Sequence, residues 1–383
     1  MRKIILLGAS GSIGKQTIDI IKKHRRSLDL VGISIGNHVE VVDSILREFH
    51  NIQYVTLKNA CDVDIFSKKY PKITFASGDK GILSLIEKVN ADLVVNALVG
   101  FVGFLPTIKT IEKGIDIALA NKESLVVGGD LINALLKQNR GHLYPIDSEH
   151  VALAKCLHGN KEVAKLVLTA SGGSFRDLTR EQLKNVTRED ALKHPSWKMG
   201  EKITIDCATM MNKGFEIIEA YHLFKVPLEK IDILLHDESH IHSLVEFNDG
   251  SYLADIGPAD MRIPISYALF KGKRIKNDFC RMPLNEFPTF HFRRFDLKRY
   301  PCVGFAIQAL KIGGTMPAVL NASNEEAVYA FLDKKIGFIE IEEIIEKVMN
   351  KHIVIKSPRV EELINADKWA RDEAQKIIRR IRL

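Results

Sequence analysis

The sequence predicts an α/β protein with an N-terminal doubly wound parallel sheet, a central α+β domain and a C-terminal helical bundle. In the first 147 residues, short β-branched runs alternate with helical stretches, as in strands joined by crossover helices. Beyond residue 301, apolar residues recur at the spacing of amphipathic helices. A chain of 383 residues is long enough for two or three domains.

The N-terminal domain is expected over residues 1–147. Five apolar or β-branched runs are predicted as its strands, at residues 4–7, 30–35, 92–97, 115–120 and 142–146. Because helical stretches separate these runs, the strands are expected to be parallel.

The pattern changes over residues 148–282, which we predict to be the catalytic domain. A strand at 166–168 runs into a glycine-rich loop, and Asn248-Asp249-Gly250 predicts a hairpin turn. Residues 203–205 are predicted as a short strand that leads into a helix carrying Asn212, Lys213 and Glu216.

The remainder is predicted to be a linker followed by helices. Residues 283–301 are rich in Pro, Phe and Arg without a clear period, which favours a linker. Over 302–383, Ile341, Ile344, Ile345 and Val348 form a helical stripe, and a similar stripe runs to the end of the chain. Trp369 lies on that last stripe, so we expect it in the core.

Charge and composition exclude several classes of protein. The net charge of +7 comes from 55 basic and 48 acidic residues spread along the chain, which favours anionic metabolites over nucleic acid as partners. No apolar run approaches the length of a membrane span, and no signal-peptide pattern is present, so we expect a cytoplasmic protein. The five cysteines form no Cys-x-x-Cys pair, so reduced thiols are expected.

A glycine-rich turn directly follows the first predicted strand and opens a helix. Gly8, Gly11 and Gly14 have the spacing G-x-x-G-x-x-G, and such a turn can cradle a pyrophosphate at the helix N-terminus. The alternative is a turn used only for packing. The strand, turn and helix together favour a Rossmann-like, nucleotide-binding domain.

The second strand of that domain ends at Gly36-Asn37-His38. Enzymes that use NAD usually carry an acid at this point, which accepts a hydrogen bond from the ribose 2′-hydroxyl. Asn37 and His38 can instead donate to a 2′-phosphate, so the sequence favours NADPH.

Acidic residues form a candidate metal site. Asp147 and Glu149 follow the strand at 142–146, where open α/β sheets bind ligands, and extended backbone would place both acids on one face. With Glu216 they would offer oxygen ligands to Mg²⁺ or Mn²⁺. The alternative is a pair of solvated loop acids.

Three further segments carry candidate ligand-binding groups. Lys122 lies just beyond the strand at 115–120, at the same sheet edge as Asp147. Ser171-Gly172-Gly173 is expected to form a backbone nest for anions. Residues 194–200, which include Trp197, are predicted as a lid loop, the alternative being a Trp197 packed in the core.

These motifs together resemble the 1-deoxy-D-xylulose 5-phosphate reductoisomerase family over essentially the whole chain. The most specific segments are residues 119–125 and 208–214, and residues 147–150, 171–173 and 194–197 add to them in the same order. The resemblance implies conversion of 1-deoxy-D-xylulose 5-phosphate to 2-C-methyl-D-erythritol 4-phosphate for isoprenoid synthesis, by carbon-skeleton rearrangement and reduction by NADPH. It also implies a homodimer.

The resemblance implies a role for individual residues. Lys122 and Glu149 would be catalytic, and Asp147, Glu149 and Glu216 would hold the metal. Substrate contacts are implied for Lys122, Ser148, Glu149, Ser171, His194, Trp197, Met199, Cys207, Asn212, Lys213 and Glu216. Cofactor contacts are expected for Gly8, Ser10, Gly11, Ser12, Ile13, Gly36, Asn37, His38, Asn121, Glu123 and Gly200.

Two positions depart from the family pattern, and two other functions compete with it. Cys207 stands where the family usually has a serine that binds phosphate, and Asn37-His38 stands where many members have a basic residue or serine followed by asparagine. A generic dehydrogenase of a phosphorylated metabolite would need the glycine turn but not three acids. A non-catalytic binder would not need to retain Lys122.

Overall fold

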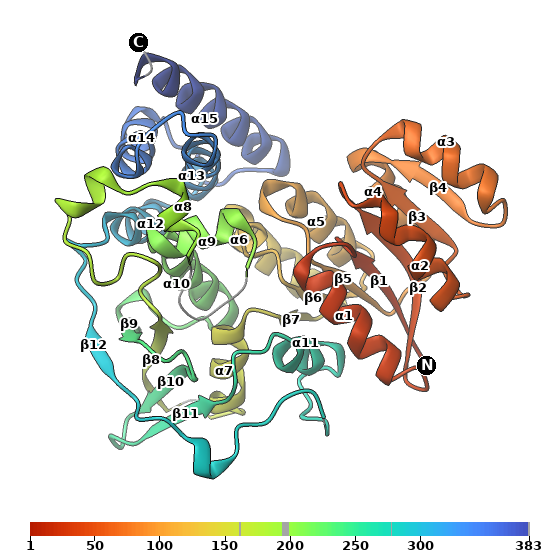
Figure 1. Ribbon diagram of the computed structural model, residues 1–383, viewed down its shortest axis with the longest axis horizontal. Coiled ribbons are helices and arrows are strands. Elements are labelled where there is room, and N and C mark those ends of the chain that lie inside the picture. The colour runs from red at the N-terminus through yellow and green to blue at the C-terminus, as the bar shows by residue number, and fades with distance from the viewer. Residues whose placement is uncertain (161, 194–198, 277, 382–383) are drawn as a thin grey trace. The chain divides into compact units, whose positions relative to one another are not determined.

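The computed structural model describes residues 1–160, 162–193, 199–276 and 278–381 (Figure 1). The chain groups into two compact units. The first unit comprises Met1–Ser124, Asp130–Val151 and Asp260–Phe279, and the second comprises Leu125–Gly129, Ala152–Ala259 and Cys280–Leu383.

The first unit contains the predicted parallel sheet. Its strands are β1 (Arg2–Leu7), β2 (Leu28–Ile35), β3 (Tyr54–Leu57), β4 (Thr74–Ser77), β5 (Leu93–Asn96), β6 (Asp116–Leu119) and β7 (Leu143–Pro145). They are ordered β4-β3-β2-β1-β5-β6-β7, and each neighbouring pair is parallel. The order reverses between β1 and β5, which is the switch point where doubly wound sheets bind ligands.

Helices cover both faces of this sheet. They are α1 (Ser12–Lys23), α2 (Val42–Glu48), α3 (Ala60–Lys69), α4 (Gly78–Lys88), α5 (Phe104–Glu112), α11 (Arg262–Leu269) and most of α6 (Lys122–Gln138). Alternate residues of β1 belong to different cores, since Ile4 and Leu6 pack in one hydrophobic cluster and Ile5 and Leu7 in another. This alternation is the pattern of a strand buried on both sides.

Two strands and one helix of the first unit were not predicted there. β3 and β4 have four residues each, too few for a clear periodic signal. Helix α11 joins the unit because its buried Ile265 and Leu269 belong to the same cluster as Ile4 and Leu6, and the helix packs against α1.

The second unit is built on a mixed sheet ordered β11-β10-β8-β9-β12. Its strands are β8 (Val163–Ala170), β9 (Ile231–His236), β10 (Ile241–Phe247), β11 (Tyr252–Ile256) and β12 (Phe292–Arg294). The predicted hairpin joins β10 to β11, and Gly250 at its turn has a φ of +83°. β12 lies inside the segment expected to be a linker and pairs antiparallel with β9.

Helices make up the rest of the second unit. They are α8 (Arg188–Ala191), α9 (Glu201–Ala208), α10 (Met211–Phe224), α12 (Pro301–Ile312), α13 (Met316–Leu332), α14 (Phe338–Lys351), α15 (Val360–Ile381) and most of α7 (Ser148–Leu157). The long helix α13 packs against α12, α14 and α15, as Figure 1 shows in blue. Trp369 is half-buried and packs against this helical core, which is the position expected for it.

The strand predicted at residues 203–205 is wrong. These residues lie inside helix α9, and Thr204 donates from Oγ1 to the carbonyl of Gly200 one turn earlier. The run Ile-Thr-Ile resembles a strand because it is β-branched. The helix forms because Lys202, Ile205 and Asp206 fall on one face and are all buried there.

Among the residues that the structure describes, no helix is both long and apolar enough to cross a membrane.

Candidate active site

The glycine-rich turn lies between β1 and α1 in the first unit, as predicted. Gly8 has a φ of +83°, and a Cβ atom there would lie 2.6 Å from the carbonyl oxygen of Ala97. A Cβ atom on Gly14 would lie 2.2 Å from the carbonyl oxygen of Gly8. Larger residues therefore cannot replace these glycines without moving the backbone.

The start of helix α1 leaves backbone donors available to an anion. The N-cap residue Gly11 has no side chain to accept from them, and the first turn of α1 contains no acidic residue. Ser12 is exposed on this turn, Ile13 is half-buried and Ser10 is buried. The turn fits a pyrophosphate, because such a helix N-terminus combines free N–H groups with a favourable dipole.

The loop after β2 is exposed and polar. Gly36, Asn37 and His38 are all exposed, and Nδ1 of His38 lies 3.1 Å from a carboxylate oxygen of Glu40. Asn37 accepts a 2.8 Å hydrogen bond from Nζ of Lys58, a residue that was not among the predicted cofactor contacts. A cation therefore stands beside the two residues that were expected to select the cofactor.

Asn121 is built into the framework of the first unit. It is the N-cap of α6, where its Oδ1 accepts from the backbone N–H of Ser124 at 3.1 Å. Its Nδ2 donates to the carbonyl of Gly100 at 2.9 Å and to Glu123 at 3.1 Å. Asn121 thus fixes the loop after β5 to the start of α6, so any contact it makes with a cofactor would come from a rigid position.

Lys122 and Asp147 meet at the carboxyl edge of the parallel sheet. Nζ of Lys122 donates to Oδ2 of Asp147 at 2.9 Å, and only 8% of Lys122 is exposed. Nδ1 of the buried His150 lies 3.4 Å from the same carboxylate oxygen. Burial alone would raise the pKa of Asp147, but the charge of Lys122 and the contacts from His150 and Lys122 outweigh it and hold that pKa well below its usual range.

Asp147 and Glu149 do not lie on an extended strand end, so the predicted geometry is wrong. Helix α7 begins at Ser148, and the backbone N–H of Val151 donates to the carbonyl of Asp147. Ser148 donates from Oγ to the carboxylate of Glu149. The two acids stay neighbours because Asp147 directly precedes the helix and Glu149 is in its first turn.

In the second unit, the loop after β8 contacts the end of helix α9. Gly172 and Gly173 have φ values of +80° and +71°, and the N–H of Gly173 donates to Oγ of Ser171 at 3.3 Å. A Cβ atom on Gly173 would lie 2.4 Å from the carbonyl oxygen of Cys207. The predicted anion nest at Ser171-Gly172-Gly173 therefore lies next to Cys207, the residue that departs from the family pattern. The order of residues in the sequence alone could not show this contact.

Helix α10 carries the other predicted groups of the second unit on its first turns. Glu216 is fully buried. Its carboxylate accepts a 2.6 Å hydrogen bond from Nδ2 of Asn212 and also pairs with the ammonium of Lys213. The N-cap residue Met210 has a φ of +62°, a left-handed conformation that costs a non-glycine residue about 1–2 kcal/mol. After this strained turn, a half-buried amide, a buried ammonium and a buried carboxylate lie on the first turns of one helix.

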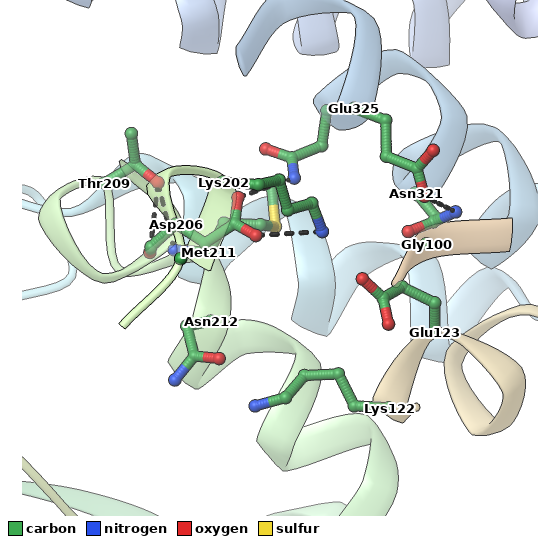
Figure 2. Close-up of polar contacts among 12 residues, drawn as sticks. Gly100, Lys122, Glu123, Lys202, Asp206, Thr209, Met211, Asn212, Asn321 and Glu325 are labelled. Atoms are coloured by element: carbon green, nitrogen blue, oxygen red, sulfur yellow. Dashed lines mark hydrogen bonds and ion pairs between the residues drawn. The ribbon is translucent and has the colours of Figure 1, made fainter. Parts of the chain in front are cut away.

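Two buried charges on α9 were not expected from the sequence. Nζ of Lys202 lies 2.9 Å from Asp206 one turn later, and both side chains are less than a tenth exposed (Figure 2). Asp206 also accepts from Nδ2 of Asn324 on α13 at 2.9 Å. In a sequence, a lysine four residues before an aspartate indicates a surface ion pair on a helix. The buried network of Lys202, Asp206 and Asn324 is seen only from the tertiary contact to Asn324.

The structure describes only part of the predicted lid loop. His194 and Trp197 lie outside the described residues. Met199 is half-buried, and the exposed Gly200 is the N-cap of α9.

Three models of one protein family match successive parts of the chain. The model described as 1-deoxy-D-xylulose 5-phosphate reductoisomerase matches residues 4–129. Two models of the C-terminal domain of the same enzyme match residues 143–224 and 256–373. The chain belongs to the 1-deoxy-D-xylulose 5-phosphate reductoisomerase family. The family and the enzyme class expected from the motifs are thereby confirmed.

Relatives of this reductoisomerase family match nearly end to end. A protein of Bacillus thuringiensis subsp. konkukian named 1-deoxy-D-xylulose 5-phosphate reductoisomerase 2 is 47% identical over 370 residues, covering 96% of this chain and 97% of the relative. The reductoisomerase of Geobacillus sp. (strain WCH70) is 48% identical over 371 residues, with 96% and 97% covered.

Solved reductoisomerase structures share the fold. The enzyme from Zymomonas mobilis in complex with NADPH has a TM-score of 0.90 and 37% identity, and covers 98% of this chain and 99% of its own. A reductoisomerase in complex with NADPH, fosmidomycin and magnesium has a TM-score of 0.92 and 35% identity, with 99% and 98% covered. The predicted fold class is confirmed.

Proposed function

We propose that this chain converts 1-deoxy-D-xylulose 5-phosphate to 2-C-methyl-D-erythritol 4-phosphate, a step of isoprenoid synthesis, with NADPH and a divalent metal ion. The observation that carries the proposal is the ion pair of the buried Lys122 and the half-buried Asp147 at the carboxyl edge of a doubly wound sheet. Family membership supplies the substrate, since the relatives carry its name. NADPH and magnesium are present in solved members of the family.

The residues of the first unit fit NADPH. Gly8 and Gly14 allow the tight turn from β1 into α1, and Gly11, the exposed N-cap of α1, has no side chain that would block a pyrophosphate. Around it we assign Ser10, Gly11, Ser12, Ile13, Gly36, Asn37, His38, Asn121, Glu123 and Gly200 to the cofactor.

The acidic residues fit a hard divalent cation. Asp147 and Glu149 of the first unit and Glu216 of the second would hold Mg²⁺ or Mn²⁺, which prefer oxygen ligands. The low pKa of Asp147 keeps that carboxylate ionised at neutral pH. When bound, the metal would polarise substrate oxygens and NADPH would supply the hydride.

Lys122 and Glu149 are assigned to proton handling. The Lys122 ammonium can donate to a substrate oxygen from the same position in which it donates to Asp147, and it is held away from water. Glu149, which accepts from Ser148, would take a proton from a substrate hydroxyl.

The phosphate end of the substrate is assigned to the second unit. The Ser171 loop, Cys207, Asn212 and Lys213 offer hydroxyl, thiol, amide and ammonium donors. His194, Trp197 and Met199 are assigned to the lid that would exclude water. The first turn of α10, on which Asn212 and Lys213 lie, contains no acidic residue, which supports an anion at this helix start.

We assign this chain to a homodimer in the cytoplasm. β11 lies at an edge of its sheet, and Tyr252, Leu253 and Ile256 on it are 56%, 51% and 44% exposed. Pairing of this edge with a second copy would cover both the open backbone groups and the apolar side chains.

The free cysteines support the assignment to the cytoplasm. The five cysteines form no disulfide, which favours a reducing compartment.

Oxidation of NADPH by the purified chain tests the function. Turnover should require 1-deoxy-D-xylulose 5-phosphate and should stop on chelation and return with Mg²⁺ or Mn²⁺. Glu216→Gln should abolish turnover, and because Glu216 pairs with the buried Lys213, urea unfolding of this variant is needed to separate a loss of folding from a loss of metal binding. Full activity of Glu216→Gln would favour a generic dehydrogenase, and no turnover by the unmodified chain would favour a non-catalytic binder.

A further inference from the structure

The loops that follow β2 and β3 bring a lysine to the predicted cofactor-selecting residues. The two strands are parallel neighbours, and Ile35 at the end of β2 is paired with Leu57 at the end of β3. Asn37 follows the first of these and Lys58 the second, so both lie at the carboxyl edge of the sheet. Nζ of Lys58 donates to Oδ1 of Asn37 at 2.8 Å.

We propose that Lys58 binds the 2′-phosphate of NADPH and makes this chain selective for NADPH over NADH. The end of the second strand is where dinucleotide-binding domains contact the adenosine ribose. Asn37 carries no charge there, whereas the Lys58 ammonium does, and both side chains are exposed to an incoming ligand. The proposal rests on the use of NADPH.

The other charged groups of this loop, His38 and Glu40, do not explain a preference for the 2′-phosphate. His38 lies 3.1 Å from the carboxylate of Glu40, so its ring faces an acid of the same loop. A carboxylate in that position repels a phosphate, and an attraction is needed to offset it. The contact with Asn37 orients the ammonium, and the Asn37 amide keeps its Nδ2 group as a second donor to the phosphate.

Binding measurements on the purified full-length chain test the role of Lys58. By isothermal titration calorimetry, Lys58→Ala should weaken NADPH binding by about tenfold and NADH binding by less than about twofold, since only NADPH has the extra phosphate. Lys58→Arg should restore most of the difference. Titration with 2′,5′-ADP and with 5′-AMP should show the same contrast without the nicotinamide.

Lys72→Ala is the matched control. Lys72 is exposed and precedes β4, so it lies at the amino edge of the sheet, whereas Lys58 lies at the carboxyl edge. Lys72→Ala therefore removes an equal charge away from the ribose site. It should alter neither affinity. The effect of Lys58→Ala should also shrink at about 1 M salt, where the Debye length falls to about 3 Å.

Two results would overturn the role of Lys58. One is an equal loss of affinity for NADPH and NADH, and the other is unchanged NADPH affinity in Lys58→Ala. Failure of the unmodified chain to bind NADPH would instead refute the proposed use of this cofactor. Asn37→Ala gives a second test, since it frees the lysine and should weaken NADPH binding less than Lys58→Ala does.

Discussion

Nζ of Lys122 lies 2.9 Å from Oδ2 of Asp147, so the first residue of helix α6 is bound to the residue that precedes helix α7. The ion pair links the ends of two neighbouring strands, β6 and β7, at the carboxyl edge of the sheet. It holds a cation and an anion in fixed positions without water between them, which is a favourable arrangement for proton transfer.

Removal of the Lys122 ammonium should therefore impair turnover more than binding of the cofactor. Lys122→Ala is expected to lower kcat by about 10²–10⁴-fold, the range for loss of a proton donor. Steady-state kinetics with 1-deoxy-D-xylulose 5-phosphate would measure it, and calorimetry would show NADPH affinity within about twofold of the unmodified chain. Lys137→Ala, an exposed change near the other end of α6, is the control. A kcat within tenfold of the unmodified value would contradict a catalytic Lys122.

The buried Asp116, which pairs with the half-buried Arg2 at 2.7 Å, should make the first unit sensitive to acid. Burial raises the pKa of Asp116. The opposing effect is larger and comes from the hydrogen bond of Lys271, the backbone N–H of His142 and the charge of Arg2, so the net shift of the pKa is downward. The stabilising contribution is therefore present above the unfolded pKa of about 4 and is lost as pH falls through the lower folded value.

Asp116→Asn should reveal this dependence. At pH 7 we expect it to lower the free energy of unfolding by about 1–2 kcal/mol, a value reduced for partial exposure. Urea unfolding from pH 7 to pH 3 should show the two chains converge as the pH falls. Asp64→Asn, at an exposed aspartate of the same unit, should change stability little at any pH. A difference that persists at pH 3 would mean that Asp116 acts through packing.

The sequence predicted the elements whose signals are local. The turn from Gly8 to Gly14 and the strand before it were predicted correctly, because the glycines and the β-branched run are contiguous. The polar start of α10 was also placed on a helix. In contrast, residues 203–205 were assigned to a strand, since β-branched residues favour that state unless burial on a helical face decides otherwise.

Contacts between distant residues could not be predicted in the same way. The bond between Lys58 and Asn37 depends on the register of β2 and β3, and β3 itself was not predicted. The extended geometry expected for Asp147 and Glu149 failed because the chain begins a helix at Ser148. Residue types indicated the chemistry, whereas tertiary register determined which side chains meet.

The network around Asp206 should be important for stability. Asp206→Ala removes the carboxylate that pairs with the buried Lys202 ammonium and accepts from the Asn324 amide, so we expect a loss of about 3–5 kcal/mol in unfolding free energy. The double variant Lys202→Met/Asp206→Leu should recover most of this loss, since apolar residues can replace a buried pair. Chemical denaturation of both would measure it. Glu201→Ala, which removes an exposed pair with Arg188, should cost at most about 1 kcal/mol.

If Asp206→Ala and the double variant were equally unstable, lost packing and not an uncompensated charge would be the cause. A loss of less than about 1 kcal/mol in the unfolding free energy of Asp206→Ala would mean that Lys202 and Asp206 behave as a solvent-exposed ion pair, which their burial contradicts.

The thiol of Cys207 should limit the affinity for the substrate. Its backbone carbonyl faces Gly173, so residue 207 lies against the loop assigned to the phosphate, where a serine hydroxyl would donate a stronger hydrogen bond. Cys207→Ser is expected to lower KM for 1-deoxy-D-xylulose 5-phosphate by about tenfold, equivalent to about 1–2 kcal/mol, with kcat little changed. Steady-state kinetics would measure it, and Cys61→Ser, at an exposed cysteine, is the control. An unchanged KM in Cys207→Ser would mean that the phosphate is held by Ser171, Asn212 and Lys213 without residue 207.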